Sequence, residues 1–148
     1  MTTTGLDVFD RTVHKSNVWL NEMMQALGWS DRHGAYLALR VTLHALRDRL
    51  TLEEMAHLGA QLPLLIRGVY YDGWDPARQP LRMRTKEEFL DRIAAEFRSL
   101  DPIDPEAIAR AVFTVLSARV TEGEIADVKH VLPAEIRSLW PEPRRSAA

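Results

Sequence analysis

An internal repeat is the sequence feature that most restricts how this chain can fold. When Pro63 is placed over Pro133, residues 16–70 align with residues 86–140 without a gap, at a constant offset of 70 positions. Of the 55 aligned pairs, 12 are identical, and many others exchange one apolar side chain for another. A repeat of this length indicates one structural unit present twice, with each copy burying its apolar face against the other.

The spacing of apolar residues predicts that each unit is helical, because these residues recur every three or four positions. Two further signals mark helix starts: a threonine followed three residues later by a glutamate, and an aspartate followed by a proline. The expected helices are 16–27 and 86–98, 32–49 and 105–119, and a third pair that begins at Thr51 and Thr121 and ends near Gln61 and Val131.

Pro63 and Pro133 predict a break in the helix followed by a new start. A proline inside a helix removes a hydrogen bond and disfavours helical geometry in the preceding residue, whereas the first turn of a helix accepts it. We therefore expect a short fourth helix after each proline, and in the first unit we expect Leu64, Leu65 and Ile66 to point inward.

These elements predict an all-α fold, a single helical bundle built from two tandem pseudo-symmetric units of about four helices each. We expect one domain over residues 1–148, because units of this size are marginal alone. Its parts are unit one (16–70), a linker (71–85) rich in breakers, unit two (86–140) and a disordered tail (141–148).

Composition excludes several classes of protein. The formal net charge is −2 and there is no cysteine, so a strongly basic nucleic-acid footprint, disulfides and thiolate metal sites are absent. The N-terminus does not resemble a signal peptide, and no apolar run is long enough for a membrane span. We find no nucleophile elbow, phosphate-binding loop or dinucleotide motif, and so expect a cytoplasmic protein that is not an enzyme and has no catalytic residues and no cofactor.

Several arginines occupy equivalent positions in the two units, whereas no lysine does. This difference suggests a specific use of the planar, bidentate donor group of arginine. One interpretation is a partner-binding surface on the linker and the adjoining faces. Its candidate residues are Arg67, Arg137, Tyr71, Trp74, Arg82 and Arg84. The alternative is structural: Arg67 and Arg137 would pair with Glu54 and Glu124, and the aromatic residues would close the core.

The segment Glu53–His57 contains the weak metal candidates Glu53, Glu54 and His57. Glu-x-x-His is half of the motif found in di-iron carboxylate bundles. The second unit has Gly123 and Asp127 at the positions of Glu53 and His57, so the site would be lopsided. A solvated, capped helix face is the alternative interpretation.

A basic stripe on the second helix carries Arg40, His44 and Arg47. Together with Arg78, Arg82, Arg84 and Lys86 in and after the linker, and with nearby aromatic residues, it could contact single-stranded nucleic acid. Interspersed aspartates and the acidic net charge favour a solvated face instead.

The stretches RVTLHALRDRL, EEMAHLGAQLPLLIRGVYYDGWDP and VKHVLPAEIRSLWP resemble a bacterial family of unknown function, number 2267 in the domain-of-unknown-function series. The resemblance covers about residues 8–141. It implies an all-helical, cytoplasmic, stress-associated protein that is not catalytic, and it assigns no catalytic role to any residue.

Taken together, the sequence predicts a non-catalytic helical interaction module that meets an unknown protein partner or a second copy of itself. The first alternative is a nucleic-acid-binding accessory protein. The second is a binder of a metal or small molecule.

Overall fold

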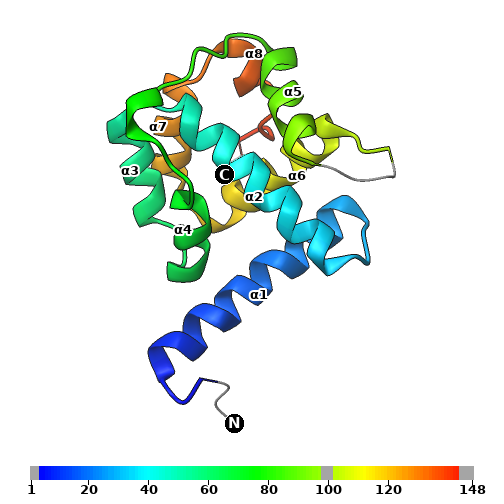
Figure 1. The fold of residues 1–148 in the computed structure, drawn as a ribbon, viewed down its shortest axis with the longest axis vertical. Coiled ribbons are helices and arrows are strands. Elements are labelled where there is room, and N and C mark those ends of the chain that lie inside the picture. Colours follow the sequence, from blue (N-terminus) through cyan, green and yellow to red (C-terminus); the bar gives the residue numbers. More distant parts are fainter. Residues whose placement is uncertain (1–3, 98–101, 144–148) are drawn as a thin grey trace, which may run out of the picture.

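The computed structural model describes residues 4–97 and 102–143, and in this part of the chain every regular element is a helix (Figure 1). None of these helices is both long and apolar enough to cross a lipid bilayer. The elements are α1 (Asp7–Leu27), α2 (Arg32–Arg49), α3 (Leu52–Ala60), α4 (Leu64–Tyr71), the 3-10 helix η1 (Pro76–Arg78), α5 (Lys86–Glu96), α6 (Pro105–Arg119), α7 (Glu122–Val131) and α8 (Ala134–Arg137).

Side-chain caps set the helix starts, as the sequence predicts. The hydroxyl oxygens of Thr51 and Thr121 accept hydrogen bonds from backbone N–H groups at 3.2 and 3.4 Å, at the starts of α3 and α7. Asp104 caps α6 in the same way, directly before a proline at the first helical position. Pro63 and Pro133 precede α4 and α8, so the predicted break and new start are confirmed at both places.

Two helix bounds differ from the prediction. Helix α1 begins at Asp7 instead of residue 16, because its N-terminal part has no counterpart in the repeat and so gives no paired signal. That part of the helix contacts α4 instead, where the Thr12 hydroxyl accepts a hydrogen bond from the backbone N–H of Leu65 at 2.9 Å. Helix α5 ends at Glu96, and position 98 of the predicted helix lies outside the described residues.

The two halves interlock through their helices. Helices α2 and α6 contact each other, α1 packs on both of them, and α5 packs on both of them as well. Helix α3 of the first half contacts α7 of the second. The shared core includes Leu43, Leu46, Phe113 and Leu116, all fully buried. The N-terminal end of α1 projects beyond the centre of the bundle, with α4 as its neighbour (Figure 1), and the twofold relation between the halves stays a prediction.

The inward orientation predicted for the start of α4 is wrong for two of three residues. Ile66 is buried, with 4% of its surface exposed, but Leu64 and Leu65 are 51% and 48% exposed. The first turn of α4 has one face on the bundle and one face in solvent, so three consecutive side chains cannot all point inward.

The basic stripe on α2 binds the C-terminal end of α4. The buried Arg47 donates to the backbone carbonyls of Tyr70 and Asp72 at 2.9 and 3.0 Å, and Nε2 of His44 donates to another α4 carbonyl at 2.6 Å. Arg40 forms an ion pair with the Asp72 carboxylate at 2.7 Å. The last carbonyls of a helix have no partner within the helix, and the stripe supplies those partners.

The retained arginines Arg67 and Arg137 do not pair with Glu54 and Glu124, which corrects the structural expectation. Arg67 donates to three carbonyls around the end of α3, at 2.9–3.2 Å, and Arg137 donates to two carbonyls around the end of α7, at 2.8 and 2.9 Å. The proline that ends each of these helices has no N–H group with which to continue the helical hydrogen bonds. A branched guanidinium reaches several of them at once.

The substitution Arg67→Lys tests this role. A single ammonium cannot replace the fork that reaches three carbonyls, so we expect the free energy of unfolding to fall by about 1–2 kcal/mol, measured by urea denaturation followed by circular dichroism. The control is Arg78→Lys, at an exposed side chain without an ion pair in the described part of the chain, with an expected change below about 0.5 kcal/mol. Equal effects of the two changes would contradict the assignment.

Candidate functional site

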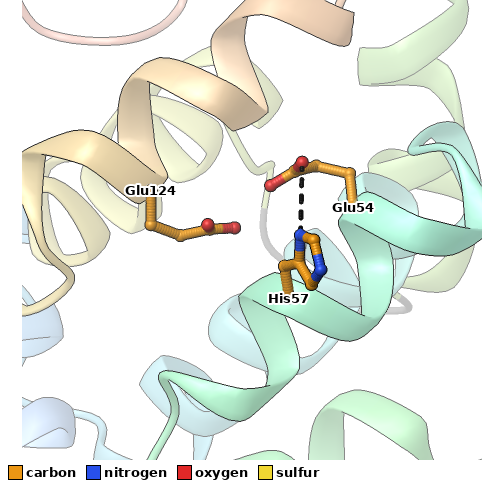
Figure 2. A group of neighbouring side chains, drawn as sticks. All are labelled: Glu54, His57 and Glu124. Carbon is orange, nitrogen blue, oxygen red and sulfur yellow. Dashed lines mark ion pairs between the residues drawn. The ribbon is translucent and has the colours of Figure 1, made fainter.

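The contact between α3 and α7 places two carboxyl groups opposite each other. Glu54 lies in the first turn of α3 and Glu124 lies in the first turn of α7, at positions 70 apart in the sequence. Figure 2 shows the two side chains pointing toward the space between the helices. Each residue is only 9% exposed, so the two carboxyl groups share an enclosed environment.

The capping boxes do not account for these carboxyl groups. In each box the threonine accepts a hydrogen bond from the glutamate N–H, but no glutamate carboxylate returns a bond to the threonine N–H within the described residues. Instead, Oε1 of Glu54 and Oε1 of Glu124 are buried without any hydrogen-bond partner. A buried acceptor of this kind is costly unless a proton or a cation occupies the space beside it.

His57 completes the cluster from the next turn of α3. Its Nδ1 lies 3.9 Å from Oε2 of Glu54, as the dashed line in Figure 2 marks. One ligand atom from each of Glu54, His57 and Glu124 can be chosen so that all three lie within 4.8 Å of one another. The His57 side chain is 57% exposed, so the cluster has two buried acidic members and one member open to solvent.

The dimensions suit a small cation after a modest adjustment. A tetrahedral ion with bonds of about 2.1 Å needs its ligand atoms roughly 3.4 Å apart. The three side chains would therefore draw in by about an ångström, which rotation about the glutamate side-chain bonds can supply. The N-terminal end of each helix also carries a partial positive charge, which favours the ionised carboxylates there.

Without a cation, the pair favours holding a proton. Burial raises the pKa of Glu124 to about 8, and the neighbouring Glu54 carboxyl and the charge of Asp127 raise it further. Two carboxylates this close cannot both ionise easily in a poorly solvated space. Asp127 occupies the position in α7 that His57 occupies in α3.

Two of the three metal candidates from the sequence therefore fall in one cluster, and the third does not. Glu53 is exposed and does not belong to it. The missed member is Glu124, because local spacing cannot reveal a partner from the other half of the chain. The signal that could have found it was the identity of Glu54 and Glu124 in the repeat, combined with packing of the third helices against each other.

Most of the predicted partner-binding residues make contacts within the chain. Arg67 and Arg137 bind helix-end carbonyls, as described above. The Tyr71 ring lies 5.1 Å from the Tyr70 ring and 6.1 Å from the Trp74 ring, and Tyr71 and Trp74 are half-buried against the core. Arg82, Arg84 and Arg137 are exposed with no ion pair in the described part of the chain, and of these three Arg137 donates to backbone carbonyls.

The fold and the site define an all-helical chain with an enclosed acidic pair where α3 and α7 meet. Comparison with protein-family models matches residues 16–139 to a family described as an uncharacterized conserved protein, DUF2267. The match covers most of the chain, and the chain belongs to this family. A search of the curated proteins found no match.

The raised pKa of Glu124 predicts how stability depends on pH in a buffer that contains a chelator. The folded chain holds this proton more tightly than the unfolded chain, whose glutamate titrates near 4.5. The resulting stabilisation is full at low pH and is lost as the pH rises from about 4.5 to about 8. This change in pKa corresponds to at most about 5 kcal/mol, and water that reaches the partly open cluster screens the charges, so the wild-type free energy of unfolding should fall by on the order of 2 kcal/mol across this window.

Glu124→Gln keeps the shape of the side chain but removes its charge, so the decline should be much smaller in this variant. Urea denaturation at a series of pH values measures the decline. Glu53→Gln, an exposed change on α3, should leave the wild-type profile unaltered. Parallel profiles for the wild type and Glu124→Gln would show that the buried pair does not bind the proton.

Proposed function

We propose that this chain is a non-catalytic, cytoplasmic binding module that holds a divalent transition-metal ion between α3 and α7. The ligands are Glu54, Glu124 and His57. The observation that carries the proposal is the pair of buried, unpartnered carboxyl oxygens beside an imidazole. The cytoplasmic location and a stress association rest on the family resemblance of the sequence.

The chemistry of the three side chains selects the kind of ion. Two carboxylates balance the double positive charge, which is required where charge is buried. An imidazole nitrogen favours first-row transition metals such as Zn²⁺, Co²⁺ or Mn²⁺ over Ca²⁺ and Mg²⁺, which prefer oxygen alone. The exposed position of His57 leaves a side open to water and provides a path for the ion to enter.

The ion would act on the stability of the bundle. Because Glu54 belongs to the first half and Glu124 to the second, one ion bound to both would link the two halves directly. A ligand that binds only the folded chain stabilises it by about 2.7 kcal/mol when its concentration is 100 times its dissociation constant. The role of the ion would then be to stabilise the fold. The site would need no catalytic role, even though the ion would keep open coordination positions.

Titration calorimetry with Zn²⁺, on protein purified without a histidine tag, tests the proposal. We expect binding of one ion per chain, and an absorption spectrum of protein-bound Co²⁺ that reports nitrogen and oxygen ligands. Glu54→Gln and His57→Ala should each weaken binding by at least about tenfold, since even groups that hydrogen-bond to a metal ligand contribute that much.

The control for this experiment is Glu53→Gln, which removes an exposed carboxylate one residue away from the cluster and should leave the affinity unchanged. Equal losses in Glu53→Gln and Glu54→Gln would indicate non-specific binding to an acidic surface. An absence of binding in the wild type would refute the metal site.

Self-association is a second candidate function, favoured by exposed apolar side chains. Leu6, Val8 and Phe9 are 49–55% exposed at the start of α1, and Leu64 and Leu65 are similarly exposed at the start of α4. The hydrogen bond from Leu65 to Thr12 places these two helix starts next to each other. We propose that a second copy of the chain covers these side chains, with the α1 helices of the two copies running antiparallel.

The charges of α1 suit this arrangement. Asp7 and Asp10 lie in its first turn, and Lys15 lies two turns further on, whereas Arg11 forms an ion pair with Asp7 of its own helix. An antiparallel pair of α1 helices would set the acidic turn of each chain near Lys15 of the other. A nucleic-acid-binding role has less support, because Arg40, His44 and Arg47 of the basic stripe contact the end of α4.

Phe9→Glu should therefore convert a dimer into a monomer, because it places a charge in the apolar centre of the contact. Size-exclusion chromatography with light scattering gives the mass. The matched control is Leu52→Glu, at an equally exposed apolar position on α3, which should leave the mass unchanged. A monomeric wild type at high concentration would reject this second candidate.

A further inference from the structure

A groove of about 430 Å³ lies between α6, α7 and residues 141–143. Its size falls within the range typical of small-molecule sites. It is separate from the Glu54–Glu124 cluster, since neither glutamate lines it. The residues that line it are Thr114, Ser117, Ala118, Glu122, Ile125, Ala126, Lys129, Pro141, Glu142 and Pro143.

The repeat explains why the groove is open. The positions 70 residues earlier than Ser117, Ala118 and Pro141 are Arg47, Asp48 and Tyr71. In the first half these three large side chains are buried or half-buried. In the second half the corresponding side chains are small, so the volume that the first half fills with its own residues is left free.

The backbone beside the groove offers hydrogen-bond acceptors that the first half satisfies internally. There, the Arg47 guanidinium donates to the carbonyls of Tyr70 and Asp72. The equivalent positions are Trp140 and Glu142, of which Glu142 lines the groove, and no described residue donates a hydrogen bond to the carbonyl of either one. Ser117 is too short to make the two bonds that Arg47 makes.

The second half lacks counterparts of the Tyr71 ring and of the Arg47 guanidinium. Shape and charge indicate which of these two groups a ligand would replace. Gly59 allows the Tyr71 ring to lie against it, because a Cβ at that position would come within 2.7 Å of the Tyr71 hydroxyl oxygen. In the second half Lys129 stands at that position, so the close approach that Gly59 permits is not available there. The place of the guanidinium remains free, and the lining carries two carboxylates, Glu122 and Glu142, against one ammonium.

We infer that the groove between α6 and α7 binds a small ligand that carries a planar amidinium or guanidinium cation on a flat apolar body. The cation lies beside Ser117, the counterpart of Arg47, and donates to the carbonyl of Glu142, near the carboxylates of Glu122 and Glu142. The apolar body lies along Ile125, Ala126 and Pro141. This inference is independent of the metal site.

Benzamidine is the probe that tests the inference, because it joins an amidinium to an aromatic ring. Two-dimensional ¹H–¹⁵N NMR of the full chain should show saturable shifts at the amides of Ser117, Ala126 and Lys129. Benzamide, which is neutral, should bind at least several-fold more weakly, and the benzoate anion should cause no saturable shift.

Ser117→Arg restores the side chain of the first half and should abolish the benzamidine shifts. Ser30→Arg makes the same chemical change at an exposed position at the end of α1 and should leave them intact. Glu122→Gln, a milder change on the lining, should weaken benzamidine binding several-fold while leaving the benzamide affinity unchanged.

Unaltered benzamidine shifts in Ser117→Arg would overturn the location of the site. Equal shifts from benzamidine, benzamide and benzoate would overturn the preference for a cation. An absence of shifts from benzamidine in the wild type would overturn the inference as a whole.

Discussion

The structure depends on side chains that donate hydrogen bonds to the backbone carbonyls at helix ends inside a packed bundle. Prolines stop α3 and α7 abruptly, and a short turn then starts the next helix, so the last carbonyls of each helix face neighbouring elements. Arg67 and Arg137 supply the donors at these two breaks, and Arg47 supplies them at the end of α4. The retention of arginine at positions 67 and 137 follows from this demand, because lysine lacks the branched donor group.

The enclosed acidic pair differs from these helix ends, because its hydrogen-bond acceptors lie together without donors. The buried oxygens of Glu54 and Glu124 lie between two helix starts, where the helix dipoles favour negative charge, and no described side chain donates to them. A proton or a cation can fill that role, and the chemistry of the neighbouring His57 makes a transition-metal ion a reasonable occupant. The most unusual polar feature of the bundle therefore lies where its two halves meet.

Local signals in the sequence predict much of the fold and less of the site. The bounds of α2 and α6 and the capped starts of α3 and α7 follow from residues within one turn of each other, and the structure confirms them. Contacts between distant elements were not predictable in this way. Leu64 and Leu65 face solvent, Arg67 binds carbonyls instead of Glu54, and the partner of Glu54 comes from the other half of the chain.

The interlocked packing of the two halves has a consequence for how the chain assembles. Because α1 packs on α6 and α5 packs on α2, either half alone would expose the apolar faces that the other half covers. A fragment containing a single half could bury those faces only by pairing with a second fragment. Two complete chains could likewise exchange halves and close the same core, so the segment of residues 72–85 that joins the halves decides between a closed monomer and a domain-swapped dimer.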